Sequence, residues 1–455
     1  MHRMKNGTER GKVPQTKIIV LDDDPTGSQT VHGCLLLTRW DVATLKEALA
    51  DRAPLFFVLT NTRGMAAERA SAVTREVCRN LKQALAGQDI HPVFVSRSDS
   101  TLRGHYPVET DVMAEELGPF DAHFLVPAFF EGGRFTRNAV HYLRSGDKEI
   151  PVHETEFARD SVFGYRHSYL PDYVQEKTAG RIQAADVKRF LLADLRAGVQ
   201  QQLLGLRDNA CVVVDAEAQD DLNRFATDLL KAAGSGKRFL FRSAASLLTA
   251  LAGLPPQPVP PAEMARYVRG GKPGAVLVGS HVPKTTSQLK ELLKQPGVAP
   301  IEVDVRRLPQ EHGPLLAEVL AQAEAMHIAG QTPVIFTSRT ERSFPDQAAR
   351  LAFGEQVSGF LMDVVRGLPM TLGFLISKGG ITSNDVLSSG LALRTARLLG
   401  QILPGVSVVR CPPDHARFAD MPVVIFPGNV GDDHALATAY RRLVGSEAAA
   451  NEIHT

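Results

Sequence analysis

The sequence predicts an α/β protein with two α/β domains that contain mainly parallel sheets, and an active site in the cleft between them. Short runs of β-branched residues alternate with longer amphipathic stretches, which is the pattern of βαβ units. The chain has 455 residues, whereas one domain usually has about 100 to 200. A proline-rich stretch, Leu254–Pro261, separates two such series of strands and helices.

The expected boundaries follow from these features. Residues 1–16 are polar and have no apolar core, so we expect a disordered tail rather than a signal peptide. The first domain is expected to cover residues 17–253 and the second residues 275–445. The proline- and glycine-rich residues 254–274 are expected to link them.

The strands are expected where β-branched and aromatic residues cluster. In the first half they are Lys17–Leu21, Cys34–Leu37, Leu55–Leu59, Val93–Ser96, His123–Val126, Cys211–Val214 and Phe239–Phe241. In the second half they are Ala275–Val278, Ile301–Val303, Val334–Phe336, Gly373–Ile376, Val406–Val409 and Val423–Phe426. Apolar residues at three- and four-residue spacing predict helices at Asp41–Ala50 and Ala66–Ala86. Ligands of such sheets bind beyond the carboxyl ends of the strands.

The composition argues against several classes of function. Lys and Arg total 51 and Asp and Glu total 50, so charge gives no reason to expect nucleic acid or an anionic membrane as a partner. No apolar run approaches the roughly 20 residues that cross a bilayer. The four cysteines are far apart and form no CxxC pair, which favours a reducing, cytoplasmic location. A homodimer is only the general expectation for a soluble enzyme.

Three adjacent carboxylates follow the first expected strand. Asp22, Asp23 and Asp24 precede Pro25, Thr26 and Gly27. Carboxylates this close repel one another unless cations or hydroxyl donors offset the repulsion. The turn therefore predicts a site for sugar hydroxyls, for magnesium or for the proton of an attacking hydroxyl. The alternative is an Asp-rich turn that caps a helix.

A second polar cluster follows the expected strand Val93–Ser96. It reads Arg97, Ser98, Asp99, Ser100, Thr101, Leu102, Arg103 and Gly104. Arg binds carboxylate or phosphate through two parallel hydrogen bonds, and Ser and Thr suit the hydroxyls of a polyol. The alternative is a salt-bridged loop. Because both clusters follow strands of one sheet, we expect them to converge on one crevice.

Glycine turns at strand ends mark the second domain. One contains Lys378, Gly379, Gly380, Thr382 and Ser383, and the other contains Gly428, Asn429 and Gly431. Adjacent glycines before a helix let backbone N–H groups approach an anion. These turns predict nucleotide binding without a P-loop, and plain βα connections are the alternative.

These motifs resemble the four-carbon acid sugar kinase family, whose members act on D-threonate, D-erythronate, L-threonate or 3-oxo-tetronate. The likeness rests on Asp23–Gly27, on Arg97–Gly104 and on the two glycine turns, and Gly279 and Ser280 resemble a third turn of its ATP domain. It extends through residues 127–138 and 152–165, where Gly132, Gly133, Arg134 and Thr136 are expected to form either a pocket loop or a tight turn. One departure is Phe426–Pro427, where one common version has Lys-Ser. If that lysine serves the phosphates, another residue, such as Lys378, has to replace it.

The resemblance implies an ATP-dependent kinase that phosphorylates a hydroxyl, expected to be the terminal one, of a four-carbon sugar acid. Asp23 or Asp24 would accept the proton, and Arg97 or Arg103 would pair with the substrate carboxylate. Magnesium would bridge the ATP phosphates, with protein ligands that the sequence does not identify. The residues expected to bind substrate are Asp22, Thr26, Arg97, Asp99, Ser100, Thr101, Arg103, Gly133 and Arg134. The residues expected to bind nucleotide are Gly279, Ser280, Lys378, Gly379, Gly380, Thr382, Ser383, Gly428, Asn429 and Gly431.

Two other hypotheses stay open. A non-catalytic sensor of a sugar acid or nucleotide would keep both pockets without transfer, and the missing lysine is the observation that favours it. A kinase for another small hydroxy acid or sugar would use the same machinery on a different acceptor.

Overall fold

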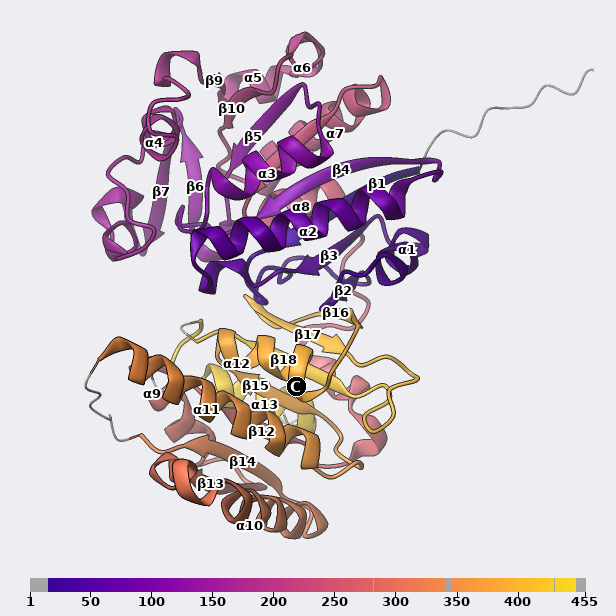
Figure 1. Cartoon of the computed structure of the whole chain (residues 1–455), viewed down its shortest axis with the longest axis vertical. Coiled ribbons are helices and arrows are strands. Elements are labelled where there is room, and N and C mark those ends of the chain that lie inside the picture. Colours follow the sequence, from indigo (N-terminus) through magenta and orange to yellow (C-terminus); the bar gives the residue numbers. More distant parts are fainter. Residues whose placement is uncertain (1–14, 281, 340–345, 429, 447–455) are drawn as a thin grey trace, which may run out of the picture.

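A computed structural model describes residues 15–280, 282–339, 346–428 and 430–446 of the chain (Figure 1). Most of the expected tail, residues 1–16, lies outside the described residues. Its last two residues already belong to strand β1 (Gln15–Asp22), because β1 runs alongside β4 (Ile90–Arg97) from its first residue.

Among the described residues, one sheet of fifteen strands runs through both halves, with the order β13-β14-β12-β15-β18-β17-β16-β2-β3-β1-β4-β11-β5-β10-β9. The further strands of the first half are β2 (Leu35–Leu37), β3 (Leu55–Leu59), β5 (Ala122–Val126), β9 (Lys188–Phe190), β10 (Ala210–Val214) and β11 (Phe239–Ser243). Those of the second half are β12 (Ala275–Val278), β13 (Val298–Val303), β14 (Thr332–Thr337), β15 (Leu375–Lys378), β16 (Thr395–Leu403), β17 (Val406–Arg410) and β18 (Pro422–Phe426). The expected α/β fold with mainly parallel pairing is confirmed.

The two halves are joined within the sheet by β2 and β16, which lie next to each other in Figure 1. They pair antiparallel, with Leu36 opposite Ala396. Backbone bonds extend the pairing on both sides, from Leu398 N to Cys34 O (2.9 Å) and from Thr38 N to Arg394 O (3.1 Å). Two domains were expected to contain separate sheets, whereas the structure shows one continuous sheet.

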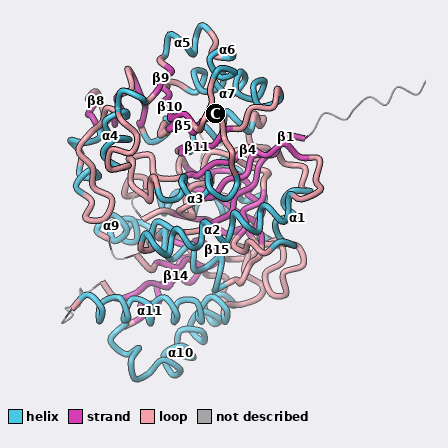
Figure 2. The backbone as a smooth tube through the Cα atoms, turned by 45° about the horizontal axis from the view of Figure 1, so that its top comes forward, coloured by secondary structure: helices cyan, strands magenta, loops and turns pink. Residues whose placement is uncertain are grey.

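Helices cover both faces of the sheet (Figure 2). They are α1 (Val42–Ala50), α2 (Ala67–Leu85), α3 (Val108–Leu117), α4 (Leu170–Lys177), α5 (Leu192–Ala197), α6 (Gln200–Gly205), α7 (Gln219–Gly234), α8 (Ala245–Ala252), α9 (Pro283–Leu292), α10 (Leu308–Ile328), α11 (Gln347–Gly367), α12 (Gly380–Asp385) and α13 (Ala435–Val444). Alternate strand residues point to opposite faces. In β1, Ile19 and Leu21 therefore pack with α1, α2 and α3, whereas Ile18 and Val20 pack with α7 and α8.

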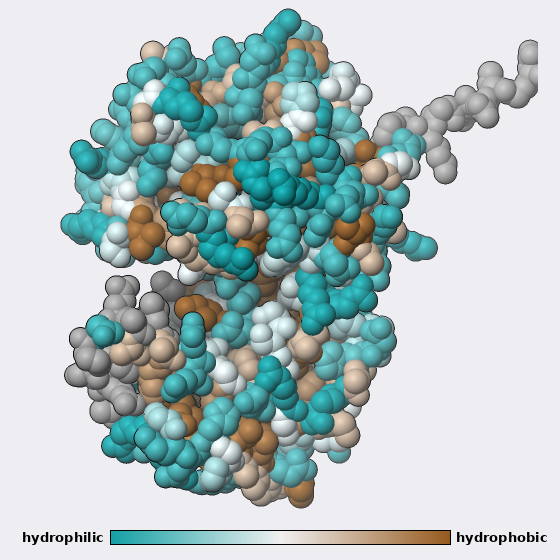
Figure 3. Space-filling model, viewed as in Figure 1, coloured by the Kyte–Doolittle hydropathy of each residue, from teal (hydrophilic) through white to brown (hydrophobic). Residues whose placement is uncertain are grey.

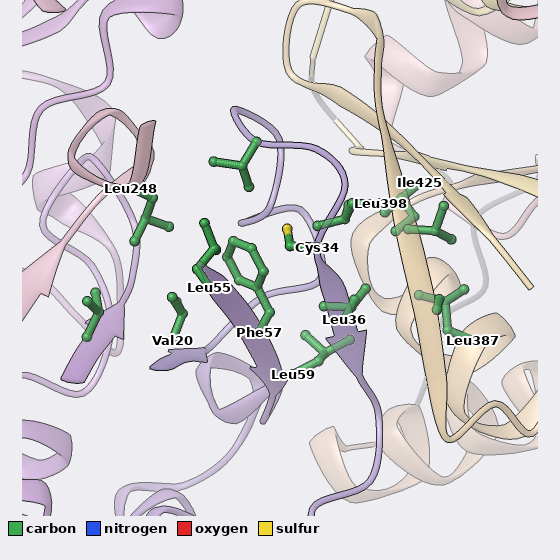
Figure 4. Packing of buried hydrophobic residues seen from close by; sticks show 14 of the residues in the cluster. Val20, Cys34, Leu36, Leu55, Phe57, Leu59, Leu248, Leu387, Leu398 and Ile425 are labelled. Carbon is green, nitrogen blue, oxygen red and sulfur yellow. The ribbon is translucent and has the colours of Figure 1, made fainter. Parts of the chain in front are cut away.

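The core on the second of these faces continues from one half into the other. It includes Val20 and Phe57 from the first half, and Leu387, Leu398 and Ile425 from the second. Figure 4 shows Cys34 and Leu36 between these two groups. Burial of apolar surface stabilises a fold by about 25 cal/mol per Å², so this shared core holds the halves together as the backbone bonds do.

Several elements were not expected. A separate antiparallel sheet of β6 (Arg134–Arg137), β7 (Val140–Ser145) and β8 (Lys148–Pro151) projects from the first half. Gln257, in the proline-rich stretch, accepts from Gln401 N (2.9 Å) and donates to Gln401 O (3.1 Å), so this stretch is bound to β16. Within the described part of the chain, no helix has both the length and the apolar character needed to cross a bilayer.

Candidate active site

The two polar clusters of the first half lie side by side, as the sequence predicted. β1 and β4 are parallel neighbours, with Asp22 opposite Arg97. The turns that follow them therefore leave the sheet at the same edge. Arg97 Nη1 lies 3.2 Å from Asp22 Oδ1, and Ser98 Oγ donates to Asp23 Oδ2 over 2.5 Å.

Asp22 is the buried member of the acidic turn, with no exposed surface. Its Oδ2 has no hydrogen-bond partner in the described structure. Gly27 packs against the carboxylate so closely that a Cβ there would lie 2.1 Å from either oxygen, which explains the glycine. Burial raises the pKa of Asp22 to about 7, with Arg97 opposing the shift and the two neighbouring carboxylates adding to it.

Asp23 and Asp24 share one arginine that sequence reasoning missed. Arg63, in a 3-10 turn after β3, places Nη2 2.5 Å from Asp23 Oδ1 and Nη1 3.2 Å from Asp24 Oδ2. Its one signal was its place after the strand that neighbours β1. The enclosed Asp23 is 2% exposed, whereas the side chain of Asp24 is 23% exposed.

Asp24 is held in its ionised form. Its Oδ1 accepts from Thr26 N (2.8 Å) and Thr26 Oγ1 (2.5 Å). Burial favours the protonated carboxyl, but Arg63, Arg97 and the bonds from Thr26 outweigh it and keep the pKa of Asp24 below its usual value.

The basic cluster folds around Asp99. Arg103 Nε donates to Asp99 Oδ2 over 2.8 Å, and Thr101 Oγ1 donates to the same oxygen. Burial opposes ionisation, yet Arg63 and Arg103 hold the pKa of Asp99 well below its usual range. Thr101 and Ser100 are buried, and the carbonyl oxygen of Ser100 contacts His141 Nε2 at 2.8 Å. Arg103 keeps 26% of its side chain exposed.

Arg134 of β6 joins Arg103 at the ring of Phe157. The guanidinium carbons lie 4.9 Å (Arg103) and 5.9 Å (Arg134) from the ring centroid. Arg134 Nη1 donates to Gly132 O over 2.6 Å, while its buried Nε has no partner in the described structure. Gly133 has φ +75° and abuts the carbonyl of Arg144, which fits the tight-turn alternative. This turn places a second arginine beside Arg103.

A buried network beneath the clusters was also missed. Arg242, the single charged residue of β11, donates through Nη2 to Ser98 Oγ (2.6 Å) and pairs through Nη1 with Glu109 Oε2 (2.6 Å). A charge within a buried strand was the available signal, because such groups need partners. A small cavity here is lined by Ser98, Asp99, Arg103, Arg242 and Ser243, among others.

In the second half, the three expected nucleotide turns meet. A Cβ at Gly279 would lie 2.3 Å from Thr382 Oγ1, and one at Gly379 would lie 3.1 Å from Ser280 Cβ. Gly379 has φ +120°, a conformation that side chains rarely adopt. Thr285 Oγ1 donates to Gly428 O (3.0 Å) and to Ser280 Oγ (3.2 Å), so one hydroxyl ties two of the turns.

The other residues expected to bind nucleotide are buried within the protein, pack against α13 or lie outside the described residues. Lys378 has no exposed surface, and its Nζ donates to the carbonyls of Pro427 (2.5 Å) and Gly428 (3.0 Å). Ser383 is buried and donates to Ser377 O (3.0 Å). Gly431 packs against Ala435 at the start of α13. Asn429 lies outside the described residues.

The two halves of the site come close together at Asp24. A Cβ added at Gly380 would lie 4.0 Å from Asp24 Oδ2, which places the carboxylate at the start of α12. Gln29 forms a second bridge when its side-chain amide is turned so that the nitrogen faces two carbonyls, Thr26 O (3.2 Å) and Gly405 O (3.1 Å). Figure 3 shows the surface hollowed where the halves meet, on the left of the view.

Comparisons with known proteins match the two halves of the chain to two different family models. Residues 18–251 match the family model of a sugar-binding N-terminal domain, and residues 275–436 match that of a nucleotide-binding C-terminal domain. A D-erythronate kinase of Heliobacterium modesticaldum is 29% identical over 220 residues, which cover 46% of this chain and 47% of that protein. The chain thus spans about half the length of this relative.

Two further matches cover most of the chain. A D-threonate kinase of Cupriavidus necator is 25% identical over 410 residues, or 87% of this chain and 90% of that protein. The crystal structure of a Haemophilus influenzae protein superposes with a TM-score of 0.64 at 18% identity, covering 93% of this chain and all of that one. At that identity the superposition establishes a shared fold.

Proposed function

Because the chain belongs to the four-carbon acid sugar kinase family, we propose that it transfers a phosphoryl group from ATP to a hydroxyl of a four-carbon sugar acid. The observation that carries the proposal is the approach of Asp24 to Gly380, where an added Cβ would lie 4.0 Å from Asp24 Oδ2. It places a carboxylate of the sugar-binding half beside the turns of the nucleotide-binding half. A phosphoryl acceptor and donor have to meet at such a junction.

The substrate carboxylate is assigned to Arg103 and Arg134. Both guanidinium groups lie around Phe157, and Arg103 is partly exposed beside the cavity. Arg97, the other arginine considered for this role, is buried and already bonded to Asp22. Arginine binds carboxylates through two parallel hydrogen bonds, which fixes the acid in one orientation.

Asp24 is assigned as the general base. Asp23 is enclosed by Arg63 and Ser98, whereas Asp24 is partly open and faces Gly380. The attacking hydroxyl gives its proton to Asp24 while its oxygen forms a bond to the γ-phosphorus of ATP. The bond from that phosphorus to the bridging oxygen breaks, and ADP leaves. A depressed pKa suits Asp24, because the carboxylate must be ionised before it accepts the proton.

ATP is assigned to the three turns around Gly279, Gly379 and Gly428. Mg²⁺ is expected with it, and it usually needs only one or two protein carboxylates when phosphates supply the other ligands. The described residues contain no cluster of three or more acidic, His or Cys side chains that could hold the ion alone. The phosphates and water would therefore supply most of its ligands.

The test is an ADP-release assay with Mg²⁺ and ATP. The acceptors are D- and L-threonate, D- and L-erythronate and 3-oxo-tetronates, with five- and six-carbon acids as controls. We expect turnover on one four-carbon acid and far less on the longer acids. Turnover only on an acid of another length would favour a kinase for a different acceptor. No turnover, together with calorimetric binding of ATP, would favour the sensor.

A further inference from the structure

Lys378 is the one lysine among the described residues of the three glycine turns, and its charged group is bound to the protein itself. Lys378 is fully buried, and its Nζ is bonded to two backbone carbonyls of the turn. Burial also lowers the pKa of Lys378 to about 7, with Lys284 adding to the shift. Lys378 thus holds the turn in shape, and the ATP phosphates need a charge from elsewhere.

Arg339 lies at the same edge of the sheet. It comes two residues after β14, which is the parallel neighbour of β12. Its Nη1 donates to Ser280 O over 2.5 Å, in the first glycine turn after β12. Ser280 in turn contacts Gly379 and Gly428. One bond therefore anchors the guanidinium where the three nucleotide turns meet.

The guanidinium carbon of Arg339 lies 5.9 Å from the centroid of the Phe336 ring, but two of its nitrogens form no hydrogen bond to a described residue. Nε and Nη2 of Arg339 are buried, and neither has a hydrogen-bond partner among the described residues. These two nitrogens form one edge of the planar group, the edge that binds two phosphate oxygens at once. No described carboxylate forms an ion pair with Arg339. Burial lowers the pKa of Arg339, and the charge of Glu302 opposes this shift. A buried donor without a partner destabilises the folded state, so a bound anion would relieve this cost.

We propose that Arg339 binds the phosphate chain of the nucleotide through Nε and Nη2. The proposal rests on the proposed function for the identity of the ligand. It adds a residue that none of the sequence motifs contains. The bond to Ser280 leaves the guanidinium fixed before the nucleotide arrives, so little side-chain freedom is lost on binding.

The experiment compares Arg339→Ala and Arg339→Lys with the wild-type chain by isothermal titration calorimetry. The probes are ADP and adenosine. Loss of a charged hydrogen-bonding group costs about 1.5–3 kcal/mol, so the Kd for ADP is expected to rise roughly 10- to 100-fold in Arg339→Ala. Arg339→Lys is expected to lose less, because it keeps the charge but not the two-pronged edge. Adenosine, which has no phosphate, is expected to bind all three proteins equally.

Arg366→Ala is the control. Arg366 lies near the carboxyl end of α11, is half exposed and pairs with Asp363 at 2.5 Å. The Arg366→Ala variant is expected to bind ADP with the same Kd as the wild type. Circular dichroism checks that each variant is folded. If Arg339→Ala does not fold, the comparison rests on Arg339→Lys. Equal ADP affinity in both Arg339 variants and the wild type would overturn the inference and leave the kinase intact, whereas no nucleotide binding by the wild type would overturn the proposed function itself.

Discussion

Three aspartates that follow one another in the sequence occupy three different environments. Asp22 is buried against Gly27 and Arg97, Asp23 is bonded through both oxygens, and Asp24 faces the other half of the molecule. The difference arises because β1 ends at Asp22 and the chain then turns. Each carboxylate is therefore expected to respond differently to neutralisation.

Asp24→Asn and Asp23→Asn test the assignment of the base. Asp24→Asn is expected to lower kcat by about 10²- to 10⁴-fold with little change in KM, because the proton acceptor is lost. Asp23→Asn is expected mainly to lower stability, by about 2 kcal/mol, because it removes charged hydrogen bonds to Arg63. Steady-state kinetics and urea denaturation provide the measurements. A larger kcat loss in Asp23→Asn, at unchanged stability, would reverse the two roles.

Asp22→Asn tests the buried carboxyl through pH. The pKa of Asp22 is about 7 in the folded chain and about 4 when unfolded. Between these values the folded state holds a proton that the unfolded state has lost, so stability falls as the pH rises. The slope is about 1.4 kcal/mol per pH unit and levels off above pH 7.

The variant cannot ionise and should lack this part of the slope. Thermal unfolding of both proteins from pH 4 to pH 8 measures the difference. Parallel curves would show that Asp22 titrates alike in the folded and unfolded states.

At this scale the sequence predicts the motifs but not their partners. The acidic turn, Arg97 and Arg103 could be identified because several polar residues follow a buried strand together. Arg242 stands alone in an apolar strand, and Arg63 follows β3 in a short polar run that contains no second charge. Their roles depend on the order of strands in the sheet, which local patterns do not determine.

At the scale of elements, the pairing of β2 with β16 is the feature that the sequence predicted least well. Long buried runs such as Leu55–Leu59 were predicted to the residue. The strand β16 was not predicted, because Gly400 and Gln401 interrupt its apolar pattern. The hairpin sheet of β6 to β8 is short and polar, so it gave no periodic signal. The pairing of β2 with β16 was beyond local sequence patterns, since it joins distant parts of the chain.

Ala396→Pro tests this pair. Ala396 is in the middle of the β2–β16 ladder, and proline has no N–H to donate. Loss of one ladder bond and one unsatisfied carbonyl at about 1 kcal/mol each predicts a loss of about 2 kcal/mol or more. Chemical denaturation measures it. Ala86→Pro is the control, because Ala86 ends α2 with φ −59°, the value of proline. Equal stability of the two variants would mean that the ladder adds little to the junction.

At the scale of the whole molecule, the shared sheet and core make the halves one unit. Arg397 adds an ion pair across the junction, with Nη2 2.7 Å from Asp51 Oδ2. Two family domains with this junction are expected to unfold together. The boundaries drawn from the sequence, 17–253 and 275–445, therefore do not imply that each half is stable alone.

Cleavage of the connection tests this expectation. A protease site is inserted after Pro256, in the proline-rich stretch, and the folded protein is cut there. The two pieces are expected to elute together in gel filtration and to unfold in a single calorimetric transition, because the junction survives the cut. An uncut sample carrying the insertion is the control. Pieces that separate and remain folded would show that each half is stable alone.

The junction also sets an order on biosynthesis. Thr38 Oγ1 donates to the carbonyl of Leu393, 355 residues further along the chain. While a ribosome is still translating the second half, β2 has no partner on its outer side, and an open strand edge invites pairing with other chains. Only when β16 leaves the exit tunnel does that edge close. The edge of β2 therefore stays open during most of the synthesis of the chain. Protection by chaperones is needed more by the nascent chain than by the finished protein.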